Sequence, residues 1–108
     1  MGVADRPRLR PMTPITAENL PEYQSRLDTL QRKNWHIGGE LDFLQKDFLF
    51  SDFKEAWQFM SKIALCAEKH NHHPEWTNVY NRVMVKWSTH DCGNKLSDLD
   101  ICMAELCE

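Results

Sequence analysis

The segment from Ser51 to about His70 constrains the fold more than any other part of this sequence. Ser51 and Asp52 supply oxygens that can cap a helix, and Glu55 follows Asp52 at capping-box spacing. Apolar residues then recur at steps of three and four, as Phe53, Ala56, Trp57, Met60, Ile63, Ala64 and Ala67. We therefore expect a long helix whose apolar stripe packs against a sheet. Phe59 and Cys66 lie off this stripe and would face a second surface, such as another subunit.

Upstream of this helix the sequence favours a shorter helix and then a hairpin. Thr16 can cap a helix that runs to Asn34, with Leu20, Tyr23, Leu27 and Leu30 at helical intervals. Pro21 falls within the first turn or so, where its missing N–H is tolerated, although it could also split off a short turn. In the run WHIGGELDFLQKDFLF, Gly38-Gly39 separates two apolar stretches, which is typical of a hairpin.

Downstream, the run VYNRVMVKW alternates between two faces. Val79, Val83, Val85 and Trp87 share the face that we expect to be buried, in one strand. A fourth strand falls either at 71–77 or at 88–92. Ser97 can cap a last helix, with Asp100 three residues later and with Leu99, Met103 and Leu106 on one side. These elements predict an α+β two-layer sandwich: a four-stranded antiparallel sheet with helices packed on one face.

Composition limits the function further. The net charge of -3 gives no electrostatic reason to expect a surface that binds nucleic acid directly. No apolar run approaches the roughly 18 residues that span a bilayer, so we expect no membrane contact. Residues 1–15 are rich in Pro and Arg and are expected to form a flexible extension before one domain at 16–108. The cysteines Cys66, Cys92, Cys102 and Cys107 form no C-x-x-C pair, and no export signal is evident, which favours reduced thiols in a cytoplasmic protein.

The stretch EKHNHHPEW at 68–76 carries the strongest indication of chemistry. His70, His72 and His73 could join His90 and Cys92 in a zinc site, but adjacent side chains diverge and no H-E-x-x-H spacing is present. The histidines could also be solvated loop residues. The third alternative is general acid–base catalysis, because two imidazoles in one pocket can divide the acid and base roles near neutral pH. Junctions between a helix and a strand commonly form the clefts that such chemistry needs.

The same stretch carries a family resemblance. EKHNHHPEW, followed by NVYN at 78–81 and STHD at 88–91, resembles pterin-4a-carbinolamine dehydratase, and Trp35 and 43–68 fit that family's pattern as well. The similarity covers about 16–108. It implies an enzyme, a hydro-lyase, that removes water from 4a-hydroxytetrahydrobiopterin and gives quinonoid dihydrobiopterin. It implies a place in tetrahydrobiopterin recycling, and it implies no metal and no organic cofactor.

The resemblance also implies the site residues. His72, His73 and His90 match the three active-site histidines; we expect His72 and His90 to share the acid and base roles, and His73 to polarise the 4a-hydroxyl. The substrate-binding residues implied are these histidines with Asn71, Pro74, Ser88, Thr89, Asp91, Trp35, Glu68 and Asp100. Each of the last three has a structural alternative, as a core aromatic, a solvated helix residue and a capping acid.

Partners follow from the resemblance too. It implies homodimers that join sheets edge to edge and homotetramers built through the helices. Animal members also stabilise dimers of a homeodomain transcription factor, so the alternative function is an interaction protein that acts as a dimerisation cofactor or coactivator. In that case a helical surface around Phe59 would matter, and a nuclear location would accompany the cytoplasmic one.

Overall fold

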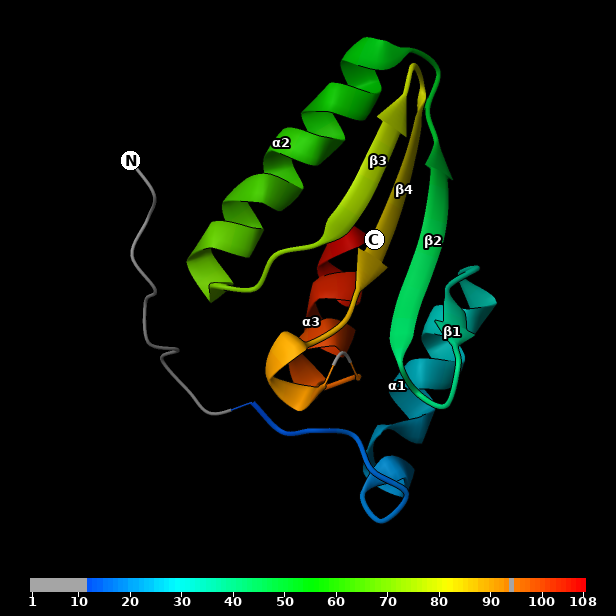
Figure 1. The fold of residues 1–108 in the computed structure, drawn as a ribbon. Helices are drawn as coiled ribbons and strands as arrows, with labels where there is room; N and C mark the ends of the chain where they lie inside the picture. Colours follow the sequence, from blue (N-terminus) through cyan, green and yellow to red (C-terminus); the bar gives the residue numbers. More distant parts are fainter. Residues whose placement is uncertain (1–11, 94) are drawn as a thin grey trace.

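The computed structural model describes residues 12–93 and 95–108. Along the chain the elements are α1 (Leu20–Arg32), β1 (His36–Gly38), β2 (Phe43–Leu49), α2 (Phe53–His70), β3 (Glu75–Val79), β4 (Arg82–Trp87), the short 3-10 helix η1 (His90–Cys92) and α3 (Asp98–Cys107). The four strands form one antiparallel sheet in the order β1-β2-β4-β3. Figure 1 shows α3 behind the sheet, with α2 and α1 on either side of it.

The core lies between the sheet and the helices. Alternate residues of β4 are fully buried (Val83, Val85 and Trp87), whereas Arg82 on the opposite face is exposed. Such alternation is what a sheet covered on one face requires. Ile63 of α2 and Ile101 of α3 complete the core from the helical side. The predicted α+β sandwich is therefore confirmed.

The cap of α2 is confirmed, but its predicted buried face is partly wrong. Asp52 accepts a hydrogen bond from the Glu55 N–H at 2.9 Å. Phe53 and Trp57, which we placed on the buried stripe, are 47% and 57% exposed, while Phe59 is half-buried and packs against the core. The reason is tertiary: β2 and the residue after it present aromatic rings, and the Phe59 ring lies 4.6 Å from Phe48 and 5.1 Å from Phe50. The helix is rotated so that these rings meet.

The run expected to be one strand is a hairpin. Val79 pairs with Arg82, so Tyr80 and Asn81 form a two-residue turn, and Val79 is exposed instead of buried. Tyr80 has φ +51°, a conformation that usually selects Gly or Asn. The Asn81 side chain fixes the turn by donating to the Phe50 carbonyl at 2.9 Å. The fourth strand is thus Glu75–Val79, which overlaps the first of the two segments expected.

The first helix begins later than expected and ends earlier. Thr16 and Asn19 bond to each other: the Thr16 N–H donates to Asn19 Oδ1 at 2.8 Å, and the Asn19 N–H donates to Thr16 Oγ1 at 3.3 Å. This separate turn precedes α1, whose first residues include Pro21. The chain leaves the helix after Arg32, and Asn34 has φ +72°.

The capping box of α3 is confirmed. The Ser97 N–H donates to Asp100 Oδ2 at 2.8 Å, and the Ser97 side chain accepts from the N–H of Asp100. Leu99 and Met103 are buried as expected, whereas Leu106 is 39% exposed.

The start of the described chain is bound to α3. The Ile15 N–H donates to the Leu96 carbonyl at 3.0 Å, and Thr13 bonds to Asp98. We therefore propose that the domain begins by Thr13, earlier than the expected boundary at residue 16. The rest of the expected extension, residues 1–11, lies outside the described residues. Within the described chain, no helix combines the length and apolar character needed to cross a membrane.

Candidate active site

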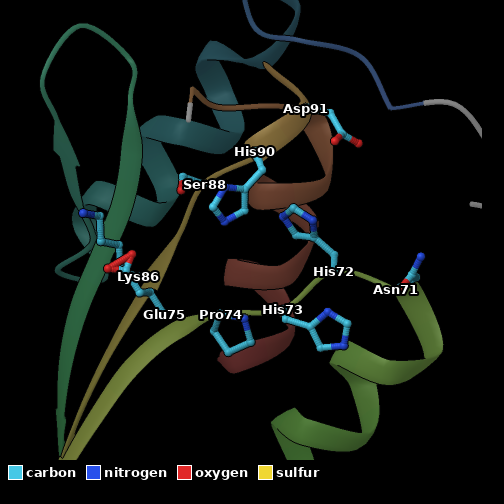
Figure 2. A pocket seen from close by; sticks show the side chains of 9 residues that line it. All are labelled: Asn71, His72, His73, Pro74, Glu75, Lys86, Ser88, His90 and Asp91. Atoms are coloured by element: carbon cyan, nitrogen blue, oxygen red, sulfur yellow. The ribbon is translucent and has the colours of Figure 1, made fainter. Parts of the chain in front are cut away.

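A polar pocket lies where the C-terminal end of α2 meets the β3–β4 hairpin. Its volume is about 240 Å³, below the range common for drug-sized ligands and suited to a small heterocycle. Figure 2 shows the side chains that line it: Asn71, His72, His73, Pro74, Glu75, Lys86, Ser88, His90 and Asp91. All but Glu75 and Lys86 were expected from the sequence. The structure thus brings together the three histidines from the two ends of the hairpin.

The end of α2 sets the directions of the two adjacent histidines. Asn71 terminates the helix in a left-handed conformation with φ +48°, and the His72 N–H donates to the Ala67 carbonyl at 3.0 Å. After this turn the two imidazoles diverge. His72 is 4% exposed and His73 is 53% exposed at its side chain, so only His72 is enclosed by protein.

His72 is held by a buried carboxylate. Its Nε2 lies 2.6 Å from Asp100 Oδ1, and its ring stacks on Trp87 at 5.9 Å between centroids and 15° between planes. A neutral imidazole in this hydrogen bond carries its proton on Nε2, which makes Nδ1 the basic nitrogen. Asp100 therefore fixes both the orientation and the tautomer of His72.

Asp100 is in turn held by a buried network. Thr89 Oγ1 donates to Asp100 Oδ2 at 2.6 Å and lies 2.7 Å from Ser97 Oγ; all three residues are fully buried. Thr89 and Asp100 were expected as substrate contacts. The structure places them beneath the pocket, where they contact His72 and each other but do not line the cavity.

The remaining expected residues take different places. Glu68 lies one helical turn before the cluster, and its Oε1 is 2.7 Å from His73 Nε2, so the carboxylate orients this second imidazole. His90 begins η1, next to Asp91 and after Ser88. Figure 2 shows the His90 and His72 rings beside each other, with His73 on the side of the C-terminal end of α2.

Trp35 does not reach this pocket. It is buried in the core, where its indole N–H donates to Glu108 Oε2 at 2.8 Å and its ring meets Phe48 edge to face. Trp35 is thus a core aromatic in this chain, which was the alternative to its predicted role in substrate binding. Among residues 12–93 and 95–108, no three His, Cys, Asp or Glu side chains are grouped as a metal-ion site would require.

Sequence reasoning missed Glu75 and Lys86. They are register partners across β3 and β4, so they stand next to each other on one face of the sheet. The signal that could have found them is the hairpin itself. Had 75–87 been divided at Tyr80-Asn81, the pairing would have placed Lys86 opposite Glu75 and beside the His-His-Pro turn.

The fold and this pocket define a class: a small α+β protein whose polar cavity holds three imidazoles, two of them oriented by carboxylates. The family model described as "Pterin 4 alpha carbinolamine dehydratase" matches residues 15–108. The chain belongs to this family, which is a family of hydro-lyases.

Individual relatives agree with this family assignment. A protein of Rhizorhabdus wittichii named "Putative pterin-4-alpha-carbinolamine dehydratase" is 45% identical over 88% of this chain and 92% of its own length. A protein of the same name from Prochlorococcus marinus is 54% identical over 68% of this chain and 78% of its own length. A crystal structure of a transcriptional coactivator/pterin dehydratase from Brucella melitensis has a TM-score of 0.74 and 38% identity, and the match covers 88% of this chain and 95% of that one.

Proposed function

We propose that this chain is a 4a-hydroxytetrahydrobiopterin dehydratase that works by histidine acid–base catalysis. The observation that carries this proposal is the convergence of His72, His73 and His90 on one small polar pocket in a chain of this family. The product, quinonoid dihydrobiopterin, would return to tetrahydrobiopterin through a separate reduction.

The reaction needs two proton transfers. The bond from C4a to the hydroxyl oxygen breaks and N5 loses its proton, so that water leaves and a C4a=N5 double bond forms. The electron count does not change, so the step needs no oxidant or reductant. It does need an acid near the departing hydroxyl and a base near N5.

The surroundings of the histidines favour a division of these roles. We assign His72 as the base, because the bond to the Asp100 carboxylate holds the proton of Nε2 and leaves Nδ1 to accept a proton, and because this carboxylate lies where it can stabilise the imidazolium that forms when N5 gives up its proton. His90 then supplies the proton to the departing hydroxyl. His73, held by Glu68, binds and polarises that hydroxyl from the more open side of the pocket.

The test is a stopped-flow dehydration assay on chemically generated 4a-hydroxytetrahydropterin. Replacing His72 or His90 by Ala should lower the rate of the enzymatic step by about a hundredfold or more, as the loss of an acid or base group does. His36→Ala is the matched control, because His36 lies on β1 and does not line the pocket. Wild-type rates in both pocket variants would refute the proposed roles. Loss of the wild-type rate with a chelator would instead indicate a metal ion.

A second role rests on a different surface. The Phe53 and Trp57 rings of α2 stack on each other with centroids 6.2 Å apart, and both are exposed, as is Leu65. This apolar face of α2 (Phe53, Trp57 and Leu65) replaces the surface around Phe59 that we expected, since Phe59 is half-buried against the core. The coactivator named in the Brucella melitensis structure makes a transcription-factor partner the alternative function. Capture of such a partner that Trp57→Lys abolishes, with dehydration unchanged, would support it.

The same proposal covers assembly and location. We propose a homodimer or homotetramer, because large apolar side chains that are exposed together on one helix, as Phe53, Trp57 and Leu65 are, can form a contact between subunits. We propose a cytoplasmic location, extended to the nucleus if the coactivator role holds.

A further inference from the structure

Glu75 and Lys86 form a charged end of the pocket that the acid–base chemistry does not use. They are direct partners in the register of β3 and β4, and both line the cavity. Figure 2 shows them at the side of the pocket away from His72 and Asn71. Glu75 follows His73 by two residues, which span at most about 7 Å along the chain. The pocket therefore has a histidine end and a charged end, separated by little more than the width of one heterocycle.

These two charges do not neutralise each other. Among the residues that the structure describes, no ion pair or hydrogen bond joins Glu75 to Lys86, although opposite charges in directly paired strand positions commonly attract. The Lys86 ammonium lies over the Phe43 ring instead, 4.3 Å from its centroid. The charged end thus offers a carboxylate that accepts hydrogen bonds beside an ammonium that donates them.

The ring under Lys86 is itself fixed. A Cβ added at Gly38 would come within 1.9 Å of the Phe43 ring, so the ring lies directly against the Gly38 backbone. Only glycine leaves room for this contact. Gly38, Phe43 and Lys86 therefore form a stack from β1 to β4 that places the ammonium at the rim of the pocket.

We propose that Glu75 and Lys86 recognise the pyrimidine edge of the pterin; this inference rests on the proposed function. That edge carries two neighbouring N–H donors, the 2-amino group and N3–H, followed by the 4-oxo acceptor. A carboxylate can accept from both donors at once, and an ammonium can donate to the carbonyl. This orientation turns the ring fusion, and with it C4a and N5, toward the histidine end.

The test compares two ligands that differ only at this edge. In 6-methyl-7,8-dihydrolumazine an oxo group replaces the 2-amino group of 6-methyl-7,8-dihydropterin, so an acceptor faces the Glu75 carboxylate. Calorimetry on the full chain should show the dihydropterin bound more tightly. Glu75→Gln should weaken dihydropterin binding about ten- to hundredfold. It should also bring the dissociation constants of the two ligands closer together, because an amide can donate to the 2-oxo group of the dihydrolumazine.

Lys86→Met gives a second, different pattern. Both ligands keep the 4-oxo group, so this variant should weaken the binding of both about equally and leave the ratio of their dissociation constants unchanged. The matched controls are Asp47→Asn, a carboxylate on the same open face of the sheet, and Arg82→Met, which shares strand and face with Lys86 about 13 Å away. Both controls should bind as the wild type does.

Failure of this inference is distinguishable from failure of the proposed function. If the wild type dehydrates the carbinolamine but Glu75→Gln keeps the wild-type ligand ratio, only the assignment of the charged end is refuted. A wild type that binds neither ligand refutes it as well. Absence of dehydration by the wild type contradicts the proposed function itself. Since Glu75 is exposed, its replacement leaves the core intact, and thermal unfolding of each variant verifies this.

Discussion

At the scale of single residues, the pocket depends on a carboxylate that does not line its cavity. Asp100 is fully buried, and its two oxygens are divided: Oδ1 holds His72, and Oδ2 accepts from Thr89 and Ser97. An isolated buried carboxylate would be costly, but one that accepts several hydrogen bonds is stabilised. Asp100 thus serves the helix cap, which is the structural alternative stated for it, and it also holds the imidazole; it does not line the cavity as a direct substrate contact would.

Asp100→Asn separates these two duties. The amide oxygen can still accept from the cap, but its NH₂ group can donate to His72 Nε2 and thereby move the imidazole proton to Nδ1. We expect kcat for dehydration to fall about a hundredfold, with a much smaller change in KM. Steady-state kinetics over a range of pH measures this. An unchanged kcat would mean that Asp100 does not set the tautomer of His72.

Cys107 gives a residue-scale prediction outside the site. Burial raises the pKa of its thiol to about 12. At pH 8 the thiolate fraction is then about 1 in 10,000, so iodoacetamide should label Cys107 only after unfolding. The Cys107 thiol ionises at a lower pH in the unfolded chain than in the folded one, so the folded state is favoured as long as the thiol stays protonated, as it does at neutral pH. The free energy of unfolding therefore falls as the pH rises from the ordinary thiol value toward 12. Mass spectrometry of native protein with Cys107 fully labelled would contradict this.

At the scale of elements, the sequence predicts features that depend on neighbouring residues, such as helix caps, but not those that depend on contacts between distant segments. The caps of α2 and α3 follow from residues three positions apart, and both formed as predicted. The turn at Tyr80-Asn81 was missed because it lacks the glycine that marks two-residue hairpins. Its conformation is fixed by a bond from Asn81 to Phe50, which is distant in sequence. The buried face of α2 was misjudged for the same reason, since the rings of β2 decide it.

The end of α2 yields an element-scale prediction. Asn71 adopts φ +48°, so Asn71→Ala should lower the free energy of unfolding by about 1 kcal/mol, whereas Asn71→Gly should cost less. Urea denaturation of the two variants measures this difference. Asn71→Gly keeps the turn and removes the amide, so a rise in its KM with unchanged stability would support substrate contact. Equal stability of both variants would show that the left-handed turn does not matter.

At the scale of the whole molecule, the three histidines could be predicted to converge, but their supports could not. The family resemblance implied that the three histidines share one site. The alternation of 79–87, taken as a single strand, would instead have kept His73 and His90 apart, and it is the turn at Tyr80-Asn81 that brings them together. The positions of Trp35 and Thr89 depend on packing between distant elements, which no local pattern encodes. Trp35 therefore lies in the core, and Thr89 lies beneath the site.

The exposed apolar face of α2 leads to a prediction about assembly. Phe53, Trp57 and Leu65 are exposed on a helix whose opposite side is packed in the core. Sedimentation at micromolar concentration should show a species larger than the monomer. Trp57→Lys should reduce its mass, because a charge would have to be buried in the contact. A wild type that is monomeric at all concentrations would contradict the proposed assembly, while leaving the pocket chemistry unaffected.

The most direct test of the central claim is the pH dependence of kcat/KM for dehydration. If His72 and His90 act as base and acid in one pocket, the wild-type profile should be bell-shaped, because one group must be neutral and the other protonated. His72→Ala and His90→Ala should each remove one limb of the bell, and different limbs. A wild-type profile that is flat between pH 5 and pH 9 would contradict the account, as would two variants that lose the same limb.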